Sequence, residues 1–423
     1  MITEPSQANE FELLECLRKI GKGMIASGSS VGVVENTLTE IATAYGMASE
    51  VVALPNVIII KLGGSIHGLL DLTVQRLTAL QLDQISELTE LIDRARQKKV
   101  IPVAAAQQVD AILQKTHRFR PPLVVFGYFL SCVGLTLLFR PDLRSVLVTG
   151  IMGVLVGLMT LSFSKAPRFH LFLPVTAALI VSVIIFSLAR FGFISGTANL
   201  IIPPLVTFLP GALLTTGMIE LASMHILSGS ARLIYGTATL FLLLVGISAG
   251  LNLSNLPSVL VTPLVGGASA WWAPVIGTFL FGIGTFVRLS GANRDLFWML
   301  LVLYVAMLAQ TIGEELINPY FGAFLAAALM AVSSELIARS PRRTPALASQ
   351  ALAFWFLVPG ARGLLSVTSL LSENYQTALI GLGEMLILIV SIALGVLLGT
   401  LIISPRKFVA PSGRSEWVEV ESV

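Results

Sequence analysis

The chain has 423 residues, of which 55% are hydrophobic and only 12% are charged, and its formal net charge is +3 at pH 7. A soluble domain carries roughly 25% charged residues, and the mean hydropathy here is +0.86. A soluble core of this size could not hide that much apolar surface from water, so the composition excludes an ordinary soluble protein. Charged residues are frequent up to residue 120 and become rare after Pro121. We therefore expect a soluble domain followed by a bundle of transmembrane helices.

Residues 1–120 predict a small cytoplasmic α+β domain. Apolar residues first recur at helical spacing, and β-rich runs separated by turn residues follow. The expected strands are 51–54, 57–62 and 66–74, and two further amphipathic helices are expected near 81–97 and 103–116. No basic segment followed by an apolar one begins the chain, so we expect no signal peptide and a domain that stays in the cytoplasm.

About ten apolar segments come next, each long enough, or nearly so, to cross a hydrocarbon core of about 30 Å as a helix. They are approximately 123–139, 145–164, 171–189, 197–223, 233–251, 271–287, 296–313, 316–335, 347–371 and 377–403. The expected organisation is 1–120 as the cytoplasmic domain, 121–251 and 271–404 as two membrane repeats, 252–270 as a connecting loop, and 405–423 as a cytoplasmic tail. A re-entrant or eleventh span at 252–270 is the alternative.

Basic residues in the short loops predict the orientation, because Lys and Arg concentrate on the cytoplasmic side. With ten spans and the N-terminus inside, the outer loops contain only Arg140, Arg144 and Arg190. The inner flanks contain Lys115, Arg118, Arg120, Lys165, Arg168, Arg232, Arg288, Arg294, Arg339, Arg342, Arg343, Arg406, Lys407 and Arg414. We therefore expect both termini in the cytoplasm and the protein in the plasma membrane, the inner membrane of a bacterial-type cell.

The membrane part repeats itself at an offset of about 150 residues. The matching pieces are Gly127–Leu130 with Gly277–Leu280, Gly134 with Gly284, Ala189-Arg190 with Ala338-Arg339, and 208–211 with 357–360. Two repeats of five spans each must insert with opposite orientations. This predicts the inverted-repeat architecture of many secondary transporters, with a substrate site near the midplane between the halves.

Two Pro-Gly pairs, Pro210-Gly211 and Pro359-Gly360, interrupt the fourth and ninth spans at matching repeat positions. Proline removes a backbone hydrogen bond, and non-helical backbone at that depth is tolerated only in the protein interior or along a water-filled cavity. Amides freed at such a break can bind a carboxylate. A plain proline kink without ligand contact is the alternative.

Ionisable groups inside spans are costly and often functional. We predict that Arg362 and the two breaks face a substrate carboxylate, and that Glu220 or Glu384 faces an ammonium group or carries a coupling proton. Thr215 can add a hydrogen bond, although helix packing is an alternative role for it. Glu220 could instead reach the membrane edge near His225, and Arg362 could be a structural partner of one of the glutamates.

The N-terminal domain contains Gly28-Ser29-Ser30-Val31-Gly32, which fits the nucleophile-elbow pattern with Ser30 as nucleophile. That elbow needs a strand before the serine, whereas the preceding segment here has helical periodicity. A glycine helix end followed by Ser30 as the N-cap of the next helix is the simpler interpretation. We expect no catalytic residues, cofactor or metal site, and no nucleotide-binding motif is present, which disfavours ATP-driven transport.

The sequence resembles the threonine/serine exporter family over nearly its whole length. The resemblance rests on 28–36, Gln75-Arg76-Leu77, 88–95, 208–211 with Glu220-Leu221, and 357–360 with Arg362-Gly363. It implies a cytoplasmic N-terminal domain, ten spans and export of small amino acids driven by the proton motive force. Some relatives in this family divide the halves between two chains and are associated with dicarboxylate export.

The expected function is therefore a secondary transporter that exports a small amino acid such as threonine or serine by alternating access, with the proton and the lipid bilayer as partners and no nucleic acid. A dicarboxylate exporter is the nearest alternative. A membrane-anchored hydrolase that uses Ser30, and a channel, are alternatives from other classes. The sequence leaves open the substrate, the coupling ion, the direction of flux, the role of the N-terminal domain and the oligomeric state, for which a homo-oligomer is one option.

Overall fold

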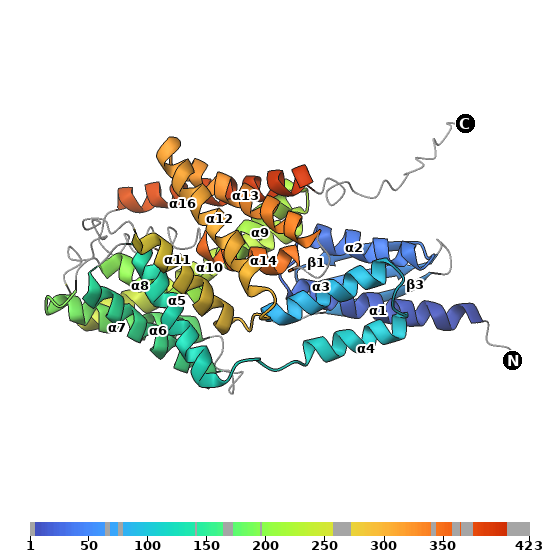
Figure 1. Cartoon of the computed structure of the whole chain (residues 1–423), viewed down its shortest axis with the longest axis horizontal. Helices are drawn as coiled ribbons and strands as arrows, with labels where there is room; N and C mark the ends of the chain where they lie inside the picture. Colours follow the sequence, from blue (N-terminus) through green and yellow to red (C-terminus); the bar gives the residue numbers. More distant parts are fainter. Residues whose placement is uncertain are drawn as a thin grey trace.

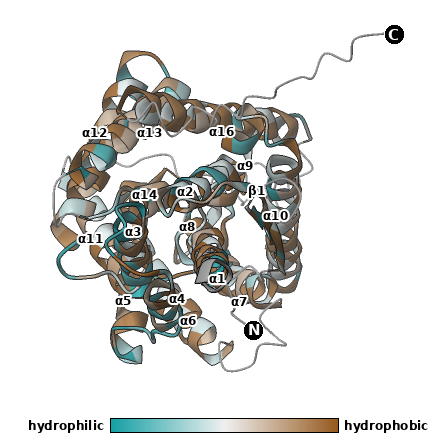
Figure 2. Ribbon diagram, turned by 90° about the vertical axis from the view of Figure 1, so that its right-hand side faces the viewer, coloured by the Kyte–Doolittle hydropathy of each residue, from teal (hydrophilic) through white to brown (hydrophobic). Residues whose placement is uncertain are grey.

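The computed structural model of the chain describes residues 5–63, 68–74, 79–139, 142–163, 172–194, 197–256, 272–339, 344–357, 364 and 375–403. The elements form two groups along the long axis of the molecule (Figure 1). Helices of the N-terminal region and a small sheet lie at one end, and the apolar helices fill the rest. Figure 2 shows hydrophilic colouring on α3 (Leu82–Arg96), mixed colouring on α4 (Pro102–Leu113), and mainly hydrophobic colouring on the surrounding helices.

The N-terminal region is α+β, as its sequence periodicity predicts. It contains α1 (Pro5–Ala26), α2 (Val31–Ala44), β1 (Ser49–Leu54), β2 (Val57–Leu62) and β3 (Leu69–Val74), followed by α3 and α4. The three strands form an antiparallel sheet in the order β1-β2-β3. On β2, Ile58, Ile60 and Leu62 alternate toward the interior, where they join Leu17 and Leu38 in a core of their own. The period-2 pattern of β2 therefore determines which face of the sheet is buried.

The apolar region is a bundle of helices. These are α5 (Pro121–Leu138), α6 (Leu143–Phe163), α7 (Leu173–Arg190), α8 (Thr197–Leu205), the 3₁₀ turn η2 (Val206–Phe208), α9 (Gly211–Ala222), α10 (Ile226–Ser254), α11 (Trp272–Arg288), α12 (Leu296–Leu316), α13 (Pro319–Ala338), α14 (Ala346–Phe356) and α16 (Tyr375–Ile403). Seven of them are long and apolar enough to cross a membrane, and the bent pair Asn199–Phe208 and Gly211–Ala222 makes up to eight within the described residues.

Two of the predicted spans differ from this set. The segment expected at 271–287 is helix α11, which is apolar but, at 17 residues, shorter than the seven membrane-length helices. The segment expected at 347–371 is helical as α14 and is described only up to Leu357 and at Leu364. Helix α10 continues to Ser254, beyond the predicted end at 251, and most of the predicted loop lies outside the described residues. The multi-pass membrane class is therefore supported, and the count of ten spans stays a prediction.

The same helix contact occurs in both membrane halves. A Cβ on Gly246 of α10 would lie 2.7 Å from the Cβ of Ala178 on α7, and a Cβ on Gly395 of α16 would lie 2.9 Å from the Cβ of Ala327 on α13. Gly395 and Ala327 each lie about 150 residues after Gly246 and Ala178, which is the offset of the sequence repeat. Small residues let helix backbones approach closely in membranes, so the two halves use equivalent residues for equivalent packing.

Helices α5 and α11 pack through a reciprocal set of glycines. A Cβ on Gly127 would lie 2.9 Å from the carbonyl oxygen of Gly284, and a Cβ on Gly277 would lie 2.7 Å from the carbonyl oxygen of Gly134. In the sequence, Gly127 matches Gly277 and Gly134 matches Gly284. Exchanging each residue for its repeat equivalent therefore turns one contact into the other, as in a self-complementary interface.

Candidate functional site

The predicted break at Pro210-Gly211 is present in the structure. Helix α8 contains Pro203 and Pro204 and gives way to η2, after which Leu209 has extended backbone and Pro210 precedes α9. The two helical parts meet at a bend of 67°. The prolines withhold amide hydrogen bonds along this stretch, which explains why the helix cannot continue straight. The matching residues Pro359, Gly360 and Arg362 lie outside the described residues.

Thr215 lies on α9 after the break and is fully buried. Its hydroxyl is without a hydrogen-bond partner among the described residues. A buried hydroxyl normally bonds to a nearby carbonyl or water, so this oxygen is available to a polar ligand. Its role as a substrate-binding residue stays a prediction, as do the roles of Pro210 and Gly211.

A buried arginine lies against the break, and the sequence analysis missed it. Arg288, at the end of α11, is 6% exposed and donates from Nη1 to the hydroxyl of Thr207 in η2, at 2.8 Å. Its guanidinium carbon lies 5.3 Å from the ring centroid of Tyr128 on α5. The sequence treats Arg288 as a loop charge, because it directly follows an apolar run. No polar residue separates Arg288 from the apolar run before it. This was the signal from which an arginine inside the membrane bundle could have been predicted.

Glu220 is at the end of α9 and lies where the bundle meets the N-terminal region. Its carboxylate is 1% exposed and accepts from Nε of Arg232 on α10, which is 5% exposed, at 3.0 Å. It also accepts from the backbone amide of Val31 at 3.0 Å, and Arg232 donates to the carbonyl of Ser29 at 3.3 Å. The buried ion pair therefore holds the loop before α2 from both sides. The substrate and proton roles of Glu220 stay predictions.

A second polar pair lies beside the first. His225, in the turn between α9 and α10, places Nε2 3.2 Å from the carboxylate of Glu35 on α2. The other carboxylate oxygen of Glu35 accepts from the amide of Ala53 on β1 at 2.8 Å. A Cβ on Gly32 would lie 2.8 Å from the His225 ring, so this glycine leaves the room that the ring occupies. Glu35, His225 and Glu220 line a cavity of about 920 Å³ whose other wall is formed by leucines of α16.

The glycine-serine motif is thus part of this junction. The segment before it is helix α1, and Gly28 has a positive φ of 84° at the end of that helix. Ser30 occupies the N-cap position of α2 with extended backbone, although its side chain makes no capping hydrogen bond. The absence of a preceding strand removes the geometry that a nucleophile elbow requires. The motif instead brings the Val31 amide and the Ser29 carbonyl to Glu220 and Arg232.

Helix α3 makes a second junction, with the turn between α11 and α12. The amides of Leu82 and Asp83 donate to the carbonyls of Leu289 and Ser290, at 2.9 and 3.2 Å. The hydroxyl of Ser86 donates to the buried carboxylate of Asp295 at 2.8 Å, and Thr344 donates to the same carboxylate at 3.0 Å. The first turn of α3 is therefore joined to the second membrane half by backbone and side-chain hydrogen bonds.

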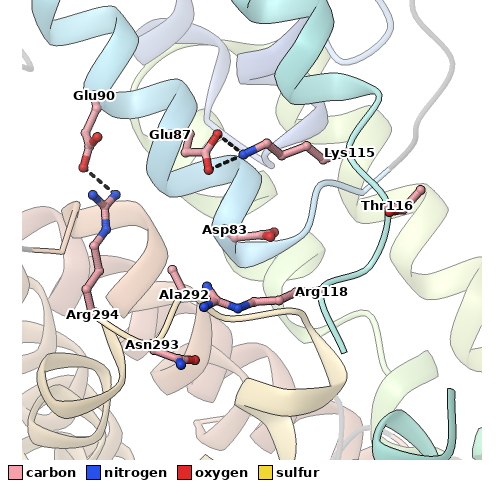
Figure 3. A pocket seen from close by; sticks show the side chains of 9 residues that line it. All are labelled: Asp83, Glu87, Glu90, Lys115, Thr116, Arg118, Ala292, Asn293 and Arg294. Atoms are coloured by element: carbon pink, nitrogen blue, oxygen red, sulfur yellow. Dashed lines mark hydrogen bonds and ion pairs between the residues drawn. The ribbon is translucent and has the colours of Figure 1, made fainter. Parts of the chain in front are cut away.

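Charged residues surround this second junction (Figure 3). Glu90 of α3 pairs with Arg294 of the α11–α12 turn at 2.5 Å, and Glu87 pairs with Lys115 after α4. They line a cavity of about 690 Å³. Burial raises the pKa of the Asp83 carboxyl in this cavity, against the opposing effect of its hydrogen bonds from the Gln84 amide and the Ser290 hydroxyl. The Glu90–Arg294 pair, which crosses the junction, is half-exposed, so it orients the two surfaces more than it stabilises them.

The remaining candidates are less informative. Glu384 lies on α16, is half-buried and has an interaction with its surroundings. Its role as a proton carrier stays a prediction. Among the described residues, no group of three or more His, Cys, Asp or Glu side chains is placed to bind a metal ion.

Comparisons with known proteins cover both halves. One family model for threonine/serine exporters matches residues 15–254, and a second model for threonine/serine exporters matches residues 270–402. Pheromone-regulated membrane protein 10 of the yeast Debaryomyces hansenii is 25% identical over 246 residues, which are 56% of this chain and 24% of that protein. The chain thus aligns with about a quarter of the yeast protein's length. No solved structure matches the chain. Because the first model alone covers more than half of the residues, the chain belongs to the threonine/serine exporter family.

Proposed function

We propose that this protein exports threonine, serine or a similar small amino acid across the inner membrane by alternating access, coupled to the proton motive force. The observation that carries the proposal is the match of exporter models to both halves of one chain. The two halves also share equivalent helix packing at Gly246 and Gly395, and reciprocal packing between α5 and α11. These contacts support two repeats of opposite orientation, which rock against each other in transporters of this architecture.

The N-terminal domain would act as a gate at the cytoplasmic side. Through Ser29 and Val31 it contacts α9 and α10 of the first half, and through α3 it contacts the α11–α12 turn of the second half. Rocking changes the distance between these two attachment points, so at least one of them must release when the cytoplasmic side opens. The ion pair at the first junction, Glu220–Arg232, is buried, whereas the pair across the second junction, Glu90–Arg294, is half-exposed and adds little stability. The second junction is therefore the one that releases.

The transport test is counterflow in proteoliposomes loaded with unlabelled threonine or succinate and supplied with a trace of the same labelled compound. Exchange of threonine or serine is the expected result. Exchange of succinate alone would replace the proposal with dicarboxylate export, and exchange of neither by folded protein would contradict it. Downhill flux that never responds to a proton gradient would instead indicate a channel.

Proton coupling is tested by Glu220→Gln and Glu384→Gln. Exchange moves no net protons, whereas concentrative transport driven by a pH gradient requires them. A carrier glutamate replaced by glutamine should therefore keep counterflow and lose gradient-driven transport. If both variants respond to the gradient as the unmodified protein does, neither residue carries the proton.

The gate is tested by cross-linking α3 to the α11–α12 turn. Glu90→Cys with Arg294→Cys places two exposed thiols at the junction, and a short reducible bis-thiosulfonate should join them and stop exchange until it is reduced. Glu87→Cys with Lys115→Cys is the matched control, because it joins two parts of the N-terminal domain with the same chemistry. Full transport with the Glu90–Arg294 link in place would contradict the gate.

A further inference from the structure

The environment of Arg288 gives a more specific inference about substrate recognition, which rests on the proposed transport function. Its side chain is buried in the membrane bundle and points to the 3₁₀ turn η2 of the broken span, where Thr207 accepts its hydrogen bond at 2.8 Å. A buried guanidinium in a membrane protein has a high desolvation cost. Breaks in membrane helices often lie at substrate sites, so a guanidinium beside one is well placed to bind a ligand.

Glycines on two neighbouring helices determine where this guanidinium lies. A Cβ on Gly127 of α5 would lie 3.1 Å from the backbone nitrogen of Arg288, so glycine lets the end of α11 come close to α5. A Cβ on Gly157 of α6 would lie 3.0 Å from the ring of Tyr128, so the ring occupies the space that a side chain would fill. The Tyr128 ring is thereby held beneath the guanidinium at 5.3 Å, a cation–π distance.

The three residues of this arrangement are not repeated in the sequence of the other half. At the offset of about 150 residues, Arg288 corresponds to Leu138, Thr207 to Phe356 and Tyr128 to Thr278. The duplication therefore preserved the glycine contacts between α5 and α11, whereas Arg288 and its partner Tyr128 each lack an equivalent in the other half. A transported amino acid is itself asymmetric, with a carboxylate at one end and an ammonium group at the other, and the unrepeated position of Arg288 suits its carboxylate.

We propose that Arg288, oriented by Thr207 and Tyr128, binds the carboxylate of the exported amino acid at the first helix break. The planar guanidinium presents two parallel donors that match the two carboxylate oxygens, which an ammonium group cannot do. Thr215, whose buried hydroxyl is unpartnered among the described residues, follows the same break on α9 and can accept a hydrogen bond from the substrate.

The test measures threonine exchange and its competition by threoninamide, which lacks the carboxylate. The unmodified protein should prefer threonine, and Arg288→Gln should reduce threonine affinity roughly tenfold to a hundredfold and abolish that preference. Arg288→Lys should keep part of the affinity for threonine, because lysine keeps the positive charge. It should lose the rest, because lysine lacks the two parallel donors of the guanidinium. The matched control is Arg144→Gln, which removes another arginine that lies over an aromatic ring, Phe193, at an exposed position.

The outcomes separate this inference from the transport proposal. Absence of threonine exchange in the unmodified protein contradicts the transport function itself. Exchange in the unmodified protein with unchanged affinity and preference in Arg288→Gln overturns the carboxylate site alone. If Arg288→Gln does not fold, Arg288→Lys and Thr207→Val are compared: a raised KM for threonine with unchanged thermal stability supports the site, and an unchanged KM overturns it.

Discussion

The carboxylate of Glu220 and the guanidinium of Arg232 form a buried ion pair at 3.0 Å, and both side chains also bond to the backbone of the loop before α2. The pair therefore belongs at once to the membrane bundle and to the attachment of the N-terminal domain. Removing one partner would leave the other charge buried without compensation, which is more costly than removing both.

The first prediction concerns this pair. Glu220→Ala should lower the free energy of unfolding by about 3–5 kcal/mol, because the buried Arg232 loses its counter-charge. The double variant Glu220→Ala with Arg232→Ala should be less destabilised than the sum of the two single variants. Thermal unfolding in detergent measures both effects. Strict additivity of the two losses would contradict a direct interaction.

The second prediction concerns the glycines between α5 and α11. A Cβ on Gly134 would collide with the Phe281 backbone, and a Cβ on Gly284 would collide with the Ser131 backbone, since Ser131 and Phe281 are repeat equivalents. Gly134→Ala and Gly284→Ala should each lower the free energy of unfolding by about 1–3 kcal/mol, and the two losses should be similar. The control is Gly383→Ala on α16, where a Cβ would meet nothing within 4 Å. A loss as large in the control as at Gly134 would refute the packing argument.

The third prediction concerns Cys16 of the N-terminal region. Burial raises the pKa of its thiol from 9.0 to about 12, so the reactive thiolate is depleted roughly a thousandfold at a given lower pH. The folded protein should react slowly with maleimide, and denaturant should release the reaction. Between pH 9 and 12 the unfolded chain loses this proton while the folded chain keeps it, so stability should fall as pH rises through that window.

The fourth prediction concerns Asp295, the buried acceptor for Ser86 and Thr344. Asp295→Ala leaves the Ser86 hydroxyl without that acceptor and should loosen α3, which amide hydrogen exchange of residues 82–96 would detect as faster exchange. Asp142→Ala is the matched control, since Asp142 also accepts from a serine, Ser145, but lies away from α3 in the chain, next to α6. Equal exchange of α3 in both variants would show that Asp295 does not hold the junction.

Local patterns in the sequence were sufficient for several features. The helical periodicity around Leu17 and Leu38, the alternation in β2 and the Pro-Gly pair at 210–211 each correspond to an observed element. These features depend on neighbours along the chain, and the backbone preferences of proline and of alternating apolar residues act at that range. The sequence also led to the family, which both membrane halves confirm.

The side-chain partners could not be predicted in the same way. Arg232 and Arg288 look like ordinary flanking charges, and only the fold brings Glu220 to one and Thr207 to the other. The role of Gly28–Gly32 was hidden for the same reason, because its contacts lie on α9 and α10, about two hundred residues away. Contacts at such separations depend on tertiary packing, which no local pattern encodes.

The docking of α3 on the α11–α12 turn has a consequence for how the chain can be divided. The N-terminal domain continues covalently into the first membrane half and is hydrogen-bonded to the second. The domain therefore connects the two halves through non-covalent contacts, in addition to the direct contact of α5 with α11. Two polypeptides produced from a gene cut between residues 256 and 272 should therefore still assemble and purify together. One gene or two could then encode the same transporter.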